Sequence, residues 1–385
     1  MTKEEKEQQK KSPLRGAGFL TALFKKEPVL TVSALCMCVS MFFVPPSRAY
    51  LGYIDFRVLA LLFCLMAVVA GLQKHGLFTW MAGRMLTGKK QRRTLFLLLI
   101  LLPYFSSMLV TNDVALITFV PFAILILELT GQQKYMIFTV VLQTVAANLG
   151  SMATPVGNPQ NLYLYSRFQL TAGAFFQIVL PYALLALPLL AASVLFCPRG
   201  EVSVSLAPAA SPGKSRQVWI YLFLFLLCLL SVFHVLHYAI LLAVVCIALL
   251  AVDRSLYRAM DYSLLLTFVC FFVFAGNIGS IQGVRDFLQG LLSRQPLLTG
   301  ALASQVISNV PAAVLLSGFT QDCRALLLGT DIGGLGTPIA SLASLISFRL
   351  YIKTRRADAG KYLAFFLSVN AAWLLLYLFI ALLAG

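Results

Sequence analysis

Charged residues are scarce in this chain of 385 residues: Asp, Glu, Lys and Arg make up 11% of it, whereas hydrophobic residues make up 60%. A soluble domain carries charge at about a quarter of its positions, so this composition excludes a water-soluble globular protein. Apolar stretches of about 20 residues, the length of a membrane-spanning helix, recur along the chain. The short alternating strands of a membrane β-barrel are missing from the sequence. We therefore expect an all-α polytopic membrane protein.

Acidic residues and histidine are scarcer still, with 14 Asp and Glu and three His against 30 Lys and Arg, a net charge of +16. Such an excess is typical of nucleic-acid partners and also of the cytoplasmic loops of membrane proteins. No basic run is interleaved with aromatic residues in a hydrophilic domain, so we expect the lipid bilayer and no nucleic acid as partner. The sequence also lacks H-E-x-x-H and G-x-S-x-G motifs, and its eight cysteines form no C-x-x-C pair. We therefore expect neither an enzyme nor a disulfide framework.

The positions of the basic residues predict the topology. If the N-terminus is cytoplasmic, 24 of the 30 Lys and Arg lie on the cytoplasmic side, and the six outside are Arg48, Arg57, Arg167, Arg285, Arg294 and Arg324. This path predicts a cytoplasmic basic tail (1–27), a first membrane half (28–197), a cytoplasmic linker (198–217) and a second membrane half (218–385). Hairpins at 94–129 and 297–318 then enter from opposite sides, so the two halves are predicted to be inverted repeats.

A polar motif occurs twice in these apolar surroundings. T-N-D-V-A-L (111–116) and S-N-V-P-A-A (308–313) align at an offset of 197 residues. N-L-G-S-M-A-T-P (148–155) and D-I-G-G-L-G-T-P (331–338) align at an offset of 183. Each half thus predicts a hairpin followed by a helix that glycine and proline interrupt. The pattern is typical of an inverted-repeat transporter with two re-entrant hairpins and two broken helices.

Polar groups at this depth predict a binding site between the halves. Pro155 and Pro338 free helix carbonyls, and the glycines permit unwound backbone. A broken helix offers amides to an anion and carbonyls to a small cation. For either motif alone, the alternative is a kinked helix whose polar side chains satisfy backbone groups within a packed bundle. The candidate substrate- and ion-binding residues are Thr111, Asn112, Asp113, Asn148, Gly150, Ser151, Thr154, Pro155, Gly157, Asn158, Ser308, Asn309, Val310, Asp331, Gly333, Thr337 and Pro338.

Asp113 and Asp331 are the sharpest of these candidates. An acid at membrane depth costs at least about 2.5 kcal/mol, so its presence suggests a function. The two carboxyl groups could converge at the centre and bind a proton or a sodium ion. The alternative is that each caps a helix fragment. We expect no cofactor and no metal other than this possible coupling sodium ion.

The same residues resemble a known superfamily. T-N-D-V-A-L-I-T-F-V-P-F (111–122), A-N-L-G-S-M-A-T-P-V-G-N-P-Q-N (147–161) and the second-half S-N-V-P-A and G-T-P are similar to the ion transporter superfamily. Over roughly residues 28–383 the resemblance is to the citrate-transporter-like domain of arsenite permeases and some sodium–proton antiporters. It implies a homodimer and elevator-type movement. The dicarboxylate branch has Ser-Asn-Thr tips, whereas Asp113 and Val310 stand third here. An ionised Asp113 would repel a dianion, which disfavours di- and tricarboxylates.

We therefore predict a secondary active transporter of a small inorganic or organic anion, coupled to protons or sodium. We expect it to lie in the bacterial cytoplasmic (inner) membrane with its N-terminus in the cytoplasm. One alternative is a cation–proton antiporter that uses Asp113 and Asp331 without binding an anion. Another is a structural or sensory membrane protein that transports nothing.

Overall fold

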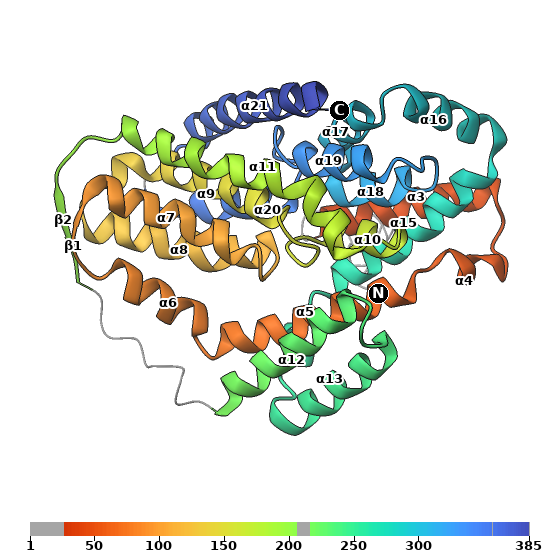
Figure 1. The fold of residues 1–385 in the computed structure, drawn as a ribbon, viewed down its shortest axis with the longest axis horizontal. Helices are drawn as coiled ribbons and strands as arrows, with labels where there is room; N and C mark the ends of the chain where they lie inside the picture. The colour runs from red at the N-terminus through yellow and green to blue at the C-terminus, as the bar shows by residue number, and fades with distance from the viewer. Residues whose placement is uncertain (1–26, 206–215, 356, 385) are drawn as a thin grey trace, which may run out of the picture.

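The computed structural model describes residues 27–205, 216–355 and 357–384, and these are mostly helical (Figure 1). The predicted tail up to residue 26 and the linker over 206–215 lie outside the described residues. Within these ranges, five helices are long and apolar enough to cross a membrane. They are α5 (Phe56–Lys74), α8 (Asn112–Leu129), α11 (Ala172–Ser193) extended by the 3-10 turn η2 (Val194–Phe196), α15 (Tyr262–Ser280) and α21 (Ala359–Ala384).

The remaining elements are divided between the two halves. In the first half they are α3 (Pro28–Phe43), α4 (Ala49–Tyr53), α6 (Leu77–Leu86), α7 (Arg92–Ser106), η1 (Gln133–Tyr135), α9 (Met136–Ser151) and α10 (Pro159–Arg167). In the second half they are α12 (Arg216–Val232), α13 (Tyr238–Val252), α14 (Leu256–Ala259), α16 (Gln282–Arg294), α17 (Pro296–Ile307), α18 (Asn309–Leu316), α19 (Cys323–Gly333) and α20 (Leu342–Tyr351). Helices α7–α8 and α17–α18 form the two hairpins, while α9/α10 and α19/α20 are the two interrupted helices.

The expectation of an all-α chain is wrong in one place. Strand β1 (Gly88–Gln91) pairs antiparallel with β2 (Glu201–Val204) at one edge of the molecule (Figure 1). The segment Glu201–Val204 lies in the predicted linker, where Val202 and Val204 are buried and their neighbours exposed. That alternation is typical of a half-buried strand. With four residues in each strand, the ribbon is too short to stand out in the sequence.

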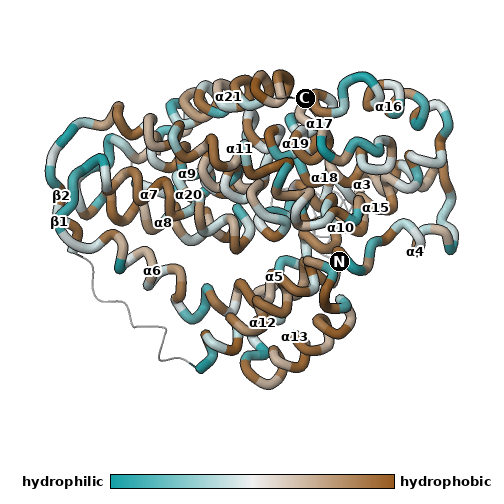
Figure 2. Tube along the Cα trace, viewed as in Figure 1, coloured by the Kyte–Doolittle hydropathy of each residue, from teal (hydrophilic) through white to brown (hydrophobic). Residues whose placement is uncertain are grey.

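Helices are exchanged between the two halves of the chain. Helix α10 of the first half packs on α18 and α19 of the second, and α20 of the second half packs on α8 and α9 of the first (Figure 1). In the same way α3 packs on α15, and α13 packs on α5. Hydrophobic residues cover most of these helices, whereas hydrophilic residues gather at the β-ribbon and along α16 (Figure 2). The halves therefore form one body.

An ion pair at one end of α5 reinforces this packing. Lys74 Nζ donates to Asp253 Oδ2, just beyond the end of α13, over 2.5 Å. Hydrogen bonds from Lys74 and Ser255 hold the pKa of Asp253 at about 2. Both residues lie in segments that the basic residues predict to be cytoplasmic.

Candidate functional site

The two hairpin tips have the same local hydrogen bonds. Helix α8 begins at Asn112 and α18 at Asn309. Each asparagine accepts a hydrogen bond on its side-chain Oδ1 from the next backbone N–H, that of Asp113 at 3.0 Å and that of Val310 at 2.9 Å. A side chain that satisfies a first-turn amide lets the helix begin inside a packed protein.

Each tip is also tied to the break in the interrupted helix of its own half. The backbone N–H of Asn112 donates to Gly157 O at 3.0 Å, and that of Asn309 donates to Ala340 O at 2.9 Å. Thr154 Oγ1 donates to Met108 O at 2.6 Å in the first half. In the second half Thr337 Oγ1 donates to Gln305 O at 3.1 Å. All of these partners obey the offsets of 197 and 183 residues that relate the sequence motifs.

The motif glycines mostly allow close packing. A Cβ on Gly150 would lie 2.1 Å from Tyr104 O, and one on Gly333 would lie 2.8 Å from the Ser304 Cβ. A Cβ on Gly157 would likewise lie 2.1 Å from Ser151 O. Within this group only Gly336, at φ +102°, uses the left-handed backbone that glycine favours. The glycines thus let each interrupted helix touch the hairpin beside it.

Buried polar side chains join the two halves across the breaks. Asn158 Nδ2 donates to Asp331 Oδ1 at 3.2 Å, and Gln160 Nε2 donates to the same oxygen at 3.4 Å. In the other direction Ser341 Oγ donates to Asn148 Oδ1 at 3.2 Å. Asn158 and Ser341 are equivalent at the offset of 183, as are Asp331 and Asn148. The second fragment of each interrupted helix therefore contacts the first fragment of the other.

A cavity of about 30 Å³ lies between the two hairpin tips. Apart from Thr267 in α15, its polar wall comes from the starts of four helices, α8, α10, α18 and α20. Among the described residues that line the cavity, none is basic. They are Val29, Asn112, Asp113, Pro159, Gln160, Leu264, Thr267, Ser308, Asn309, Val310, Pro311, Ser341 and Leu342.

The two acidic candidates occupy different surroundings. Asp113 lines the cavity, and its Oδ1 is buried without a hydrogen-bond partner among the described residues. Asp331 lies behind Gln160, which lines the cavity and donates to it. The Asp331 side chain is 4% exposed, and its Oδ2 is likewise unpartnered in the described part of the chain. Of the two acidic candidates, Asp113 therefore lines the cavity and Asp331 does not.

Five of the residues singled out from the sequence line the cavity: Asn112, Asp113, Ser308, Asn309 and Val310. The others surround it. Asn148, Ser151, Asn158 and Asp331 belong to the polar network, Thr111 precedes α8, and Gly150, Thr154, Pro155, Gly157, Gly333, Thr337 and Pro338 lie at or beside the breaks.

Sequence reasoning missed three polar residues of the wall, Gln160, Thr267 and Ser341. Thr267 lies within the apolar run of α15 and belongs to neither motif. Gln160 stands within the quoted N-P-Q-N string. Ser341 is the counterpart of Asn158 at the offset of 183 residues. Extending the second motif by three residues beyond Pro338 would have found it.

Paired hairpins, two interrupted helices and a polar cavity between them, in a multi-pass membrane protein, define a membrane transporter. The chain belongs to the citrate transporter (CitMHS) family, whose sequence profile matches residues 19–322. The match includes both hairpins and the first interrupted helix, and it ends before Asp331. The protein is therefore a membrane transporter and not an enzyme, as the sequence predicted.

Individual relatives agree with this assignment. The chain is 31% identical to the uncharacterized transporter MJ0456 of Methanocaldococcus jannaschii, over 77% of this chain and 81% of the relative. It is 29% identical to the inner membrane protein YbiR of Escherichia coli, over 80% and 84%. It is 33% identical to the silicon efflux transporter LSI3 of rice (Oryza sativa), over 43% of this chain and 35% of that protein.

Proposed function

We propose that the protein is a secondary active transporter of a small anion, which binds in the cavity between the hairpin tips. One observation carries the proposal: the N-terminal ends of four helices converge on this cavity. Each helix N-terminus carries a partial positive charge, which persists although the N–H groups of Asp113 and Val310 already donate to asparagine side chains. Together the four N-termini attract an anion where no basic side chain lines the wall. Interrupted helices direct such ends at anionic substrates in other transporters.

The size of the cavity favours a small solute. A cavity of about 30 Å³ has room for about two water molecules, because each needs about 10–15 Å³ of cavity volume. This volume disfavours a tricarboxylate, although the family is named for citrate. The rice relative is named for the efflux of silicon, an inorganic element. We therefore favour a small oxyanion as substrate.

The position of Asp113 supports coupling of transport to protons. This residue lies in the first turn of α8, within the same positive field as the substrate. An ionised carboxylate there repels an incoming anion, whereas a protonated one does not. Anion binding then favours a proton on Asp113, and the two ions move together. A sodium ion that neutralises the carboxylate serves the same purpose.

The proposal extends to the arrangement in the membrane. The equivalent hydrogen bonds at constant offsets support a duplicated fold. The basic residues support opposite orientations of the two halves, with a cytoplasmic tail (1–27), membrane halves at 28–197 and 218–385, and a cytoplasmic linker (198–217) between them. We also propose a homodimer with elevator-type movement of the hairpins. The relative YbiR, named an inner membrane protein, supports the cytoplasmic membrane as location.

A second candidate function is cation–proton antiport. The observation that favours it is Asp331, a buried carboxylate that receives hydrogen bonds from neutral amides and leaves Oδ2 unpartnered among the described residues. A carboxylate in such surroundings suits exchange of a proton for a monovalent cation.

Transport assays in proteoliposomes distinguish these functions. We expect proton flux that requires an added oxyanion of constant charge, such as sulfate, and anion affinity that falls about tenfold per pH unit above the titration of Asp113. Asp113→Asn should bind the anion with little dependence on pH. Glu128→Gln, at the exposed end of the same helix, is the matched control and should behave as the parent. Proton flux driven by sodium or potassium without any anion would instead establish the antiporter.

A further inference from the structure

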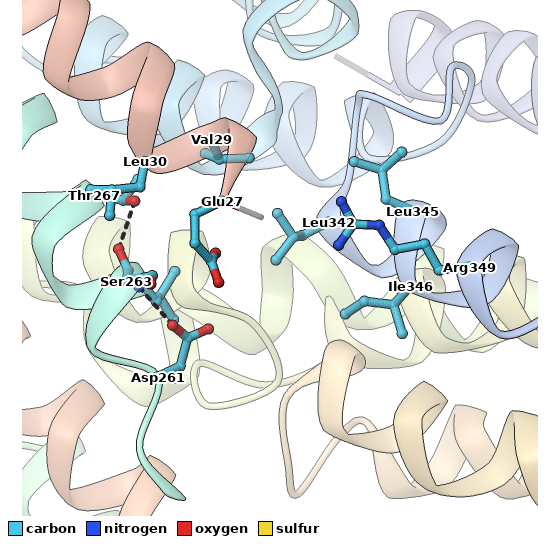
Figure 3. Close-up of a pocket in the computed structure, with 11 residues that line it drawn as sticks. Glu27, Val29, Leu30, Asp261, Ser263, Thr267, Leu342, Leu345, Ile346 and Arg349 are labelled. Atoms are coloured by element: carbon cyan, nitrogen blue, oxygen red, sulfur yellow. Dashed lines mark hydrogen bonds between the residues drawn. The ribbon is translucent and has the colours of Figure 1, made fainter. Parts of the chain in front are cut away.

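A second pocket adjoins the cavity at the hairpin tips. Its volume is about 80 Å³, and it shares Val29, Leu264, Thr267 and Leu342 with that cavity. The four shared residues line both spaces, which therefore lie next to each other. Three charged residues also line this pocket, and in Figure 3 Glu27 and Asp261 lie on one side of Leu342 and Arg349 on the other.

Burial decreases steadily along this line of residues. At the inner end Asn112 and Asn309 are each 4% exposed, and Thr267 is 3% exposed. Leu264 and Leu342 are half-buried. Asp261 and Arg349 at the outer end are exposed. The two spaces therefore lie in order between the buried hairpin tips and the exposed residues Asp261 and Arg349.

Three separate segments meet at the outer end of the pocket. Glu27 ends the basic tail, Asp261 precedes α15, and Arg349 lies near the end of α20. The distribution of Lys and Arg assigns each of these segments to the cytoplasmic side, without reference to the pocket. Among the described residues, neither acid forms an ion pair with Arg349, so no salt bridge closes the mouth.

We infer that these two spaces form a passage through which water and the transported ion reach Asp113 and Asn309 from the cytoplasm. The hairpin-tip site is then open to the inside in this conformation. Thr267 and the two leucines form its narrow part, and Glu27, Asp261 and Arg349 form its mouth. The identity of the solute rests on the proposed function, but the existence of the passage does not.

Cysteine accessibility tests the passage. Leu264→Cys places a thiol on its wall, and Leu266→Cys, two residues on in the same helix, is the matched control because Leu266 is 53% exposed and lines neither pocket. A membrane-impermeant methanethiosulfonate reagent is added to inside-out or right-side-out vesicles. Peptide mass spectrometry locates the adduct, so the eight native cysteines can stay in place.

We expect Leu264→Cys to react about tenfold faster or more from the cytoplasmic side, because the reaction needs a thiolate and hence water. The control thiol should react slowly from both sides. Equal rates from the two sides, or a faster reaction from outside, would overturn the inference. Leu342→Cys, on the opposite wall, repeats the test if the first variant does not fold.

The outcome is independent of the transport assays. If Leu264→Cys reacts faster from the cytoplasm but Asp113→Asn keeps the pH dependence of the parent, the passage stands and the proposed coupling is excluded. If Asp113→Asn loses the pH dependence but Leu264→Cys does not react faster from the cytoplasmic side, the passage is excluded and the proposed coupling stands.

Discussion

Two residues at equivalent positions of the hairpin tips differ in backbone conformation. Ser308 has φ +72° and ψ 154°, a region that glycine alone adopts readily. Thr111 has φ −65° and ψ 151°, which is ordinary extended backbone. A residue held in such a region costs about 1–3 kcal/mol and persists only where its surroundings enforce it. The tip of the second hairpin therefore stores strain that the first does not.

Glycine substitutions at these two positions should have opposite effects on stability. Ser308→Gly relieves the strained backbone and should raise the free energy of unfolding by about 1 kcal/mol. Loss of the 3.3 Å hydrogen bond from Ser308 Oγ to Ala340 O makes this gain smaller. Thr111→Gly should lower the free energy of unfolding, because glycine there only adds freedom to the unfolded chain. Thermal unfolding in detergent measures both. A fall of similar size in the two variants would show that Ser308 is not strained.

The sequence predicts the residues of the tips well and their partners poorly. Asn112, Asp113, Ser308 and Asn309 stand out because short polar side chains are costly in an apolar segment. Gln160 carries no such signal, since an amide in the first turn of a helix is common at any protein surface. Its contact with Asp331 depends on the fold that joins the two halves.

At the scale of elements, the start of α10 combines two roles in one side chain. Asn158 Oδ1 accepts a hydrogen bond from the Asn161 backbone N–H at 2.9 Å and so caps the helix. Its Nδ2 donates to Ser151 Oγ and to Asp331 Oδ1. The cap and the link between the halves can therefore be separated by substitution.

Three substitutions of Asn158 separate the roles. Asn158→Ser keeps a capping oxygen and removes the amide donor, whereas Asn158→Ala removes both and should be less stable than the serine variant by about 1 kcal/mol. Asn158→Asp keeps the cap but sets a second carboxylate against Asp331. It should be the least stable at pH 8 and recover at pH 5, as one of the two carboxyl groups takes a proton. Thermal unfolding at both pH values measures these effects, and an aspartate variant that is insensitive to pH would contradict the assignment.

Most helices could be predicted because each is an apolar run bounded by polar residues, as at α5 and α15. The interruptions could be predicted because glycine and proline mark them. The β-ribbon could not, since four residues provide too little alternation, and its partner strand lies more than a hundred residues away in sequence. Pairing over that separation leaves no local pattern.

At the scale of the whole molecule, neither half can complete its own core. Helix α10 covers α18 and α19, and α20 covers α8 and α9. The constant offsets of the two motifs indicate a duplication, but they do not reveal which half each fragment packs on. Only the fold shows that Asn148 and Asp331 receive hydrogen bonds from the opposite half.

This exchange predicts how the chain behaves when it is divided. A cut within residues 206–215 yields a first fragment with α3 to β2 and a second with α12 to α21. In the second fragment alone, the buried Asp331 side chain loses the hydrogen bonds from Asn158 and Gln160. In the first fragment alone, Asn148 keeps its bond from Asn112 and loses the one from Ser341. Both fragments also expose the helix faces that the exchanged helices cover, and an unpaired polar group in hydrocarbon costs several kcal/mol. Neither fragment should accumulate in the membrane when expressed alone. Expressed together, they should co-purify through a tag on either one.

Asn158→Asp in the first fragment should weaken that association at pH 8 more than at pH 5, whereas Gly83→Ala, where a methyl group meets no neighbour within 4 Å, should not change it. A first fragment that is stable by itself would mean that the exchanged helices contribute little to folding.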